Sequence, residues 1–124
     1  MNFKYFSLAE FDCPSLPNSG VNMDRDFLAK LDIAREYAGI SFKITSGYRT
    51  KEYNQSLQDR GYKASKNSAH TKGHAADIAC SSGKDRCIII KALLDAGFNR
   101  IGVANSFIHV DNDPSKVSDV IWTY

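Results

Sequence analysis

Three side chains from two separate segments, His70, Asp77 and His109, constrain the fold of this chain more than any other feature. Two imidazoles and one carboxylate fill three positions of a tetrahedral zinc site and leave the fourth open for water, as in catalytic rather than structural sites. Gly73 lies between His70 and Asp77 and permits a tight turn, so a loop ligand and a strand ligand can face one ion. His109 must then come from a second strand that lies beside the first.

The same side chains have a simpler explanation. A lone histidine is more often a satisfied polar group than a metal ligand, and two histidines with one aspartate also occur together by chance. In that case the histidines are structural and bind no metal. Cys80, close to Asp77, is a conceivable fourth ligand that would close the site, but its favoured explanation is a small buried apolar residue.

Composition argues against several classes of function. At 124 residues the chain is expected to form one domain, residues 1–124, large enough for a single core. Its net charge of +2 and its scattered basic residues argue against a nucleic-acid partner. The longest apolar run, residues 87–90, is interrupted by Lys91, so we expect no insertion into a membrane. The 3 cysteines form no C-x-x-C pair, which favours reduced thiols.

The N-terminal residues bear on localisation. Residues 1–7 lack the basic region and the following apolar stretch of a secretory signal. We therefore expect synthesis in the cytoplasm without a signal peptide, and a target outside the cell would have to be reached by another route.

Hydrophobic periodicity predicts a mixture of helices and strands. Helical spacing of apolar residues predicts helices over residues 24–38, 51–60 and 84–96. Alternating or β-branched segments predict strands over residues 42–45, 75–79, 100–103 and 107–110, and residues 120–122 form either an edge strand or a lid. Ser7 and Glu10 have the spacing of a capping box on a short helical turn. Together these elements predict an α+β fold, with a mostly antiparallel sheet and about three helices.

The motif residues resemble those of a known family. Residues 68–77 (SAHTKGHAAD) and 107–111 (FIHVD) resemble the S-x-H-x-x-G-x-A-x-D and later H-x-D signature of the LAS-type zinc metallopeptidases. This group contains D-Ala-D-Ala carboxypeptidases, phage L-alanyl-D-glutamate endolysins and the zinc domain of hedgehog proteins. The resemblance extends to residues 6–14 (FSLAEFDCP) and 44–50 (ITSGYRT), and so covers nearly the whole chain. It implies a hedgehog-like or D-Ala-D-Ala-peptidase-like fold with Zn²⁺ as cofactor.

The resemblance also implies roles for residues around the metal. It assigns His70, Asp77 and His109 as zinc ligands. Arg49, in the S-G-Y-R motif, would contact substrate or an oxyanion, and its fork of donors suits a carboxylate; the alternative is a solvated charge at a helix start. Ser68 and Tyr48 resemble residues that support the ligands by hydrogen bonding.

The general base is less well defined by the sequence. In many relatives an acidic residue stands three positions before the last histidine ligand, but Ser106 occupies that position here and has no suitable group. Asp111 points to the same strand face as His109 and could take the proton; alternatively, it orients a ligand or His74. His74 is the second candidate for acid or base. Asp113 and Asp119 have the character of solvated loop charges.

The implied function is zinc-dependent hydrolysis of peptidoglycan stem peptides, by a D-Ala-D-Ala carboxypeptidase or an L-Ala-D-Glu endopeptidase. We expect a monomer that acts on the cell wall and, if the chain is viral, does so during host lysis or after delivery by the virion. The alternative is a non-catalytic, zinc-stabilised domain that binds cell wall or protein, as the hedgehog zinc domain is thought to be.

Overall fold

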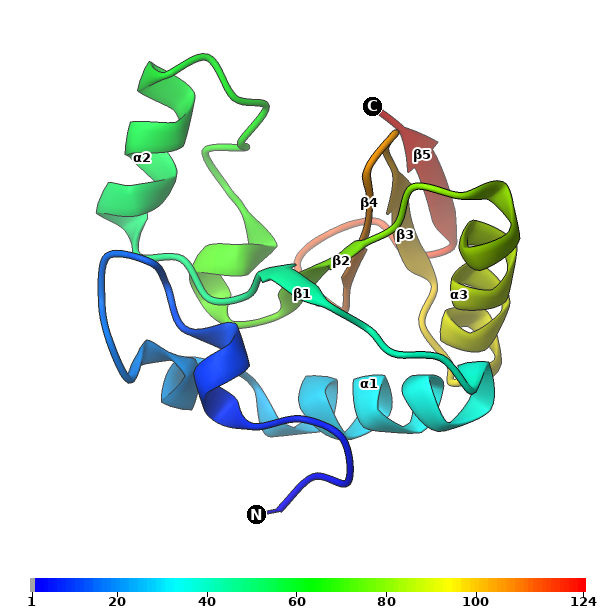
Figure 1. The fold of residues 1–124 in the computed structure, drawn as a ribbon. Helices are drawn as coiled ribbons and strands as arrows, with labels where there is room; N and C mark the ends of the chain where they lie inside the picture. The colour runs from blue at the N-terminus through cyan, green and yellow to red at the C-terminus, as the bar shows by residue number, and fades with distance from the viewer. Residues whose placement is uncertain (1) are drawn as a thin grey trace.

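A five-stranded sheet in the order β1-β2-β4-β3-β5 forms the centre of the computed structural model, which describes residues 2–124 (Figure 1). The strands are β1 (Ile44–Ser46), β2 (Ala75–Ala79), β3 (Arg100–Val103), β4 (Phe107–Asp111) and β5 (Val120–Thr123). The helices are α1 (Arg25–Ala38), α2 (Lys51–Asp59) and α3 (Gly83–Asp95), with short 3-10 turns at Leu8–Phe11, Ser19–Asn22 and Ala69–Lys72. Neighbouring strands are antiparallel except β3 and β5, which are parallel. The predicted α+β fold is confirmed.

The hydrophobic core lies between one face of this sheet and the helices α1 and α3, which pack against each other. In Figure 1, α1 runs below the sheet, α3 lies beside it, and α2 stands away from both. Ile108 and Val110 of β4 are fully buried in the core. Because successive side chains of a strand alternate between faces, His109 and Asp111 project from the opposite face. The sheet thus separates an apolar face from a polar one.

The N-terminal arm closes the core near β1. Phe6 and Phe11 are buried and meet edge to face with ring centroids 5.5 Å apart. The backbone N–H of Ser7 donates to the Glu10 carboxylate at 2.8 Å, which confirms the predicted capping box. The arm therefore contributes packing rather than chemistry.

Most predicted elements agree with the structure to within one or two residues. The main differences are that β1 begins at Ile44 rather than at Phe42, and that residues 120–123 form an edge strand rather than a lid. Phe42 is instead buried in the core, and the Lys43 carbonyl still accepts from Ala79 N–H at 2.8 Å. The β1–β2 register also shifts within the strand, between Ile44 and Ser46.

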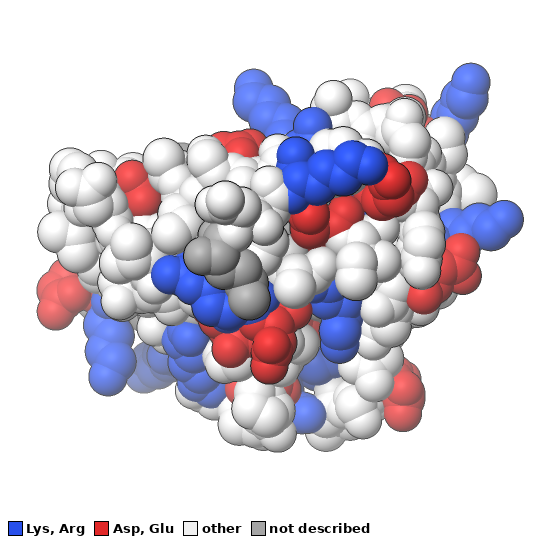
Figure 2. Space-filling view, turned by 90° about the horizontal axis from the view of Figure 1, so that it is seen from below, with Lys and Arg blue, Asp and Glu red and all other residues white. Residues whose placement is uncertain are grey.

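On the face that Figure 2 shows, Lys and Arg lie among Asp and Glu, and charges of one sign do not gather. One exposed ion pair joins Lys4 Nζ and Glu36 Oε1 at 2.8 Å. Such exposed pairs add little to stability. Within residues 2–124, none of the helices combines the length and apolarity needed to cross a bilayer.

Candidate metal centre

Three side chains, His70, Asp77 and His109, converge on the polar face of the sheet. Asp77 Oδ1 lies 3.0 Å from His109 Nδ1 and 3.3 Å from His70 Nε2. One potential ligand atom from each residue lies within 4.8 Å of the other two, and all three residues are buried. Asp77 and His109 are directly opposite each other on β2 and β4, and His70 comes from the 3-10 turn before β2. The structure thus brings together the three predicted ligands.

The backbone around His70 fixes which ring nitrogen faces the cluster. His70 Nδ1 lies 2.8 Å from the Gly47 carbonyl, which only accepts, so Nδ1 carries the hydrogen and Nε2 is left as an acceptor. Ser68 Oγ accepts from the His70 N–H at 3.2 Å, and the His70 carbonyl accepts from the Arg49 N–H at 3.1 Å. Burial lowers the pKa of His70 although Asp77 opposes the shift, so the neutral ring is favoured.

Asp111 holds the other edge of the His109 ring. Asp111 Oδ2 lies 2.7 Å from His109 Nε2, and Asp111 Oδ1 accepts from Arg100 Nε at 2.7 Å and from the Asp113 N–H at 3.2 Å. Both oxygens are thus engaged, and the residue is only 1% exposed. These contacts favour the alternative role, in which Asp111 orients a ligand, over the predicted role as proton acceptor.

The donor set fits a cation. With the outer nitrogen of each ring facing Gly47 or Asp111, the inner nitrogens and Asp77 Oδ1 all point toward one another. Burial would raise the pKa of Asp77, but the two imidazoles outweigh it and lower the pKa, so the carboxylate is ionised. Although burial opposes it, hydrogen bonds with Asp111 and Asp77 raise the pKa of His109, so a positive charge is favoured between the ring and Asp77. Two nitrogens and one oxygen suit zinc.

Arg49 lies at the edge of the cluster, as predicted. Its side chain is 12% exposed, and its Nη2 is 3.5 Å from Asp77 Oδ2, the oxygen that does not face the histidines. Nε donates to Ser46 Oγ at 3.0 Å and Nη1 donates to Asn54 Oδ1 at 3.2 Å. The guanidinium is therefore held in one orientation, and the alternative of a solvated charge is wrong.

A cavity of about 200 Å³ opens beside the cluster. Besides the cluster itself, its lining includes four cations and two aromatic residues: Arg49, Lys63, Arg100, Lys116, Trp122 and Tyr124. The sequence interpretation missed all of these except Arg49. Of these residues, Arg100 is the one that strand alternation could have identified. It lies on β3, the antiparallel partner of β4, and every second side chain of β3 projects from the same face as His109.

Two predicted site residues, His74 and Tyr48, and the cysteine at position 80 make contacts outside the cluster. His74 Nδ1 lies 2.8 Å from Asn112 Oδ1, and the residue is not among those that line the cavity. Tyr48 packs partly buried against the hydrophobic core rather than on a ligand. Cys80 is buried and its Sγ lies 3.6 Å from the Ser82 carbonyl, so within residues 2–124 it is no fourth member of the cluster. The structure supports the apolar alternative for Cys80.

Asp113 corrects another expectation. It is 3% exposed, accepts from Lys72 Nζ at 2.9 Å and from Ser115 Oγ at 2.7 Å, and is not a solvated loop charge. Burial opposes the shift, but these hydrogen bonds lower the pKa of Asp113 to about 2. The carboxylate thus ties the turn that carries His70 to the segment after β4.

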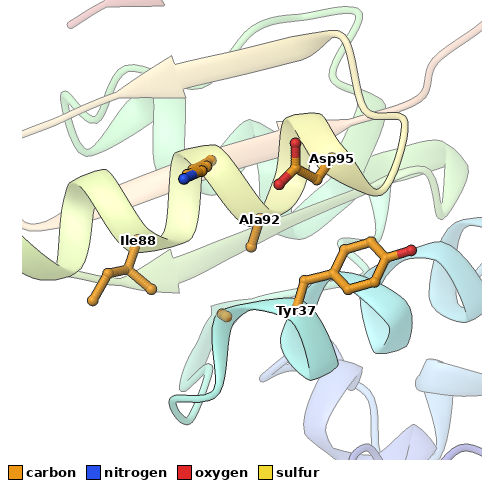
Figure 3. Close-up of a pocket in the computed structure, with 6 residues that line it drawn as sticks. Tyr37, Ile88, Ala92 and Asp95 are labelled. Carbon is orange, nitrogen blue, oxygen red and sulfur yellow. The ribbon is translucent and has the colours of Figure 1, made fainter.

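A larger groove of about 690 Å³ lies between α1 and α3 (Figure 3). Tyr37 borders it from α1, and Ile88, Ala92 and Asp95 border it from α3. Asp95 is the one carboxylate in its lining, and the groove holds none of the clustered ligands. Among the described residues, the smaller cavity beside His109 is therefore the candidate for chemistry.

Comparison with known proteins identifies the family of the chain. The sequence profile of the Peptidase M15 family matches residues 4–111, which include all three clustered residues. The fold resembles the crystal structure of the Serratia marcescens L-Ala D-Glu endopeptidase ChiX, with a TM-score of 0.54 and 19% sequence identity. That alignment covers 61% of this chain and 62% of the other, so the chain spans less than two thirds of that protein's length. No curated protein matches the chain significantly. The family match, which spans most of the sequence and agrees with the resemblance in its motifs, shows that the chain belongs to the Peptidase M15 family.

Proposed function

We propose that this chain is a zinc-dependent peptidase of bacterial cell wall that hydrolyses the L-Ala-D-Glu bond of peptidoglycan stem peptides. The observation that carries the proposal is the convergence of His70, Asp77 and His109 in a chain of the Peptidase M15 family. The choice of bond is supported by the similarity of fold to an L-Ala D-Glu endopeptidase. The expected monomer fits a diffusible enzyme of this size.

The three clustered side chains would hold the metal through His70 Nε2, a carboxylate oxygen of Asp77 and His109 Nδ1. When bound, zinc polarises a scissile carbonyl and lowers the pKa of water to roughly 7, which suits peptide hydrolysis near neutral pH. The protein supplies the fixed geometry: the Gly47 carbonyl holds the ring of His70, and Asp111 holds the ring of His109. Fixed ligands reduce the reorganisation that catalysis would otherwise require.

Arg49 would stabilise negative charge next to the metal. Its guanidinium lines the cavity while Ser46, Asn54 and Asp77 fix its orientation. A fixed cation there can neutralise the oxygen that becomes negative when water adds to the peptide carbonyl, or bind a carboxylate of the stem peptide. Overall, the water oxygen bonds to the carbonyl carbon and the C–N bond breaks. One proton of the water passes to the leaving amine, and the other stays on the new carboxylic acid until that group ionises.

Digestion of purified peptidoglycan with the zinc-loaded protein tests the proposal, with the products identified by mass spectrometry. A new N-terminal D-Glu is expected, and Asp77→Asn is the inactive control. Release of free D-Ala instead would identify a carboxypeptidase. The digestion is run between about pH 5 and 9, so that a general acid or base with a pKa near neutrality is tested in both protonation states. If zinc binds but no product forms at any of these pH values, the chain is a zinc-stabilised binding domain.

A further inference from the structure

The segment after Asp111 reaches the candidate site although it lies beyond the family match, which ends at residue 111. Residues 112–119 cross from the end of β4 to the far edge of the sheet, where β5 adds a parallel strand next to β3 (Figure 1). From this strand and its end, Trp122 and Tyr124 line the cavity beside His109. This part of the chain therefore has contacts that the family motif does not describe.

Trp122 lies beside the His109 ring, with the two ring planes tilted by 51° to each other. The centroids of the two rings are 5.5 Å apart, and Trp122 is the register partner of Gly102 on β3. A Cβ atom at position 102 would lie 2.7 Å from Trp122 Nε1, so a residue with a side chain at 102 would displace the indole. Glycine at this position therefore makes room for the contact between Trp122 and His109.

Arg100 joins the same indole to the edge of the His109 ring. Its guanidinium carbon lies 5.0 Å from the centroid of the Trp122 ring, which is cation–π distance. Its Nε donates to Asp111 Oδ1 at 2.7 Å, and Asp111 Oδ2 lies 2.7 Å from His109 Nε2. Arg100 also donates to the Val117 carbonyl, in the segment that leads into β5. One side chain thus links the C-terminal segment, the indole and the carboxylate.

We infer that Arg100 and Trp122 are positioning residues for His109, which hold its ring through Asp111 and through a ring contact so that Nδ1 points at Asp77. Arg100 acts through Asp111, and Trp122 acts by direct contact. The side chain of Arg100 is 12% exposed and that of Asp111 is 2% exposed, so their hydrogen bond competes little with water. The inference rests on the proposed function in one respect, that His109 binds the metal.

A different role for Arg100 makes a different prediction. Arg100 lines the cavity, and an arginine that binds a substrate carboxylate would raise KM when replaced but leave zinc affinity unchanged. A positioning residue instead lowers zinc affinity and kcat and leaves KM nearly unchanged, because it acts on a ligand rather than on substrate.

Zinc affinity, measured by competition with a chromophoric chelator, tests the inference in a double-mutant cycle. Arg100→Gln and Asp111→Asn are each expected to weaken zinc binding by about 10- to 100-fold. The double variant should bind no more than about threefold more weakly than Asp111→Asn alone, because Arg100 acts through that carboxylate. Arg100→Lys, which keeps the charge but not the fork, should restore part of the affinity.

Trp122 is tested with two substitutions and a control. Trp122→Phe keeps an aromatic face and should change zinc affinity by less than about threefold, whereas Trp122→Ala should weaken it by about tenfold. Arg60→Gln is the control, because Arg60 is exposed, lies over the rings of Tyr53 and Tyr62 and does not line the cavity. Thermal unfolding of the metal-free variants identifies any that fail to fold.

Two results would overturn the inference while leaving the proposed function intact. One is wild-type zinc affinity in Arg100→Gln and Trp122→Ala, and the other is a double variant whose loss is the sum of the two single losses. If the unmodified protein itself binds no zinc, the proposed function fails instead. The two failures are therefore distinguished by the first titration.

Discussion

Asp77 Oδ1 lies 3.0 Å from His109 Nδ1, and the two residues face each other as direct partners in the β2–β4 ladder. The neighbouring partners Ile78 and Ile108 point to the opposite face and are buried in the core. A slip of one residue would move His109 into the core and Ile108 out of it, at a large cost in apolar burial. Core packing in these two strands therefore fixes the geometry of the metal site.

Removing either strand ligand should abolish metal binding. We expect Asp77→Asn and His109→Ala to retain less than about 0.1 zinc per chain after gentle purification, because two remaining ligands hold the ion too weakly. Metal analysis of the purified proteins measures this. Asp95→Asn, on the exposed side of α3, is the matched control and should bind zinc like the unmodified protein. A fully zinc-loaded Asp77→Asn would show that the cluster is not the metal site.

Zinc should stabilise the folded protein in proportion to the logarithm of its free concentration. The buried cluster exists only in the folded chain, so each tenfold rise in free zinc above its dissociation constant should add about 1.4 kcal/mol to the free energy of unfolding. Urea unfolding in zinc buffers provides the measurement. The same series with Asp77→Asn should be flat, and an equal response in both proteins would place the metal elsewhere.

His74 should be dispensable for metal binding and nearly so for catalysis. Its Nδ1 faces Asn112 at 2.8 Å and it lies outside the cavity lining, in contrast to His70 four residues earlier. His74→Gln should therefore keep zinc and lose no more than about threefold in kcat/KM, whereas His70→Gln should lose both. Kinetics on a stem-peptide substrate separate the two. If zinc-loaded His74→Gln instead loses about a hundredfold or more in kcat/KM, the loss is as large as a general base contributes. His74 would then be assigned the proton transfer.

The site residues on β2 and β4 were predictable from sequence because local rules govern them. Strand alternation places His109 and Asp111 on one face, and the glycine turn at Gly73, with φ of 76°, brings the His70 turn back to β2. The family motif then adds Arg49 at the β1–α2 junction. Each inference needs only neighbours in sequence or one strand pairing.

The remaining site residues depend on long-range pairing that no local pattern specifies. Trp122 reaches His109 only because β5 runs parallel to β3 at the far edge of the sheet, after a long connection. Asp113 lies beyond the end of β4, where alternation no longer applies, and its partner Lys72 comes from a turn that is distant in sequence. The ring of His74 faces Asn112 and does not line the cavity, so closeness in sequence to His70 does not bring it to the cluster.

Replacing Arg49 even by lysine should lower the activity of the enzyme. Its three fixed contacts, to Ser46, Asn54 and Asp77, use the geometry of the guanidinium fork, which a lysine ammonium does not reproduce. Arg49→Lys should therefore keep zinc but lower kcat by about 100-fold, the scale seen when one oxyanion donor is removed. Steady-state kinetics with Arg60→Lys as control measure the effect. A change in KM alone would show that Arg49 binds a substrate carboxylate instead.

The ion pair between Lys72 and Asp113 should make stability depend on acid pH. Lys72→Met should lower the free energy of unfolding by about 1 to 2 kcal/mol near neutral pH, because it leaves a buried carboxylate with fewer donors. Lys66→Met is the control, since Lys66 is exposed and forms no recorded ion pair within residues 2–124.

The sign of this pH dependence follows from the lowered pKa of Asp113. A carboxyl whose pKa falls from 3.8 in the unfolded chain to about 2 in the folded one stabilises the fold above pH 3.8, and this stabilisation is lost as the pH falls through about 2. The difference in the free energy of unfolding between wild type and Lys72→Met should therefore be largest near pH 7. At pH 3 it should fall to about half of that value. Urea unfolding at both pH values, with chelator present because acid also releases metal, measures it. A difference that is equal at both pH values would show that Lys72 stabilises the fold by packing rather than through the charge of Asp113.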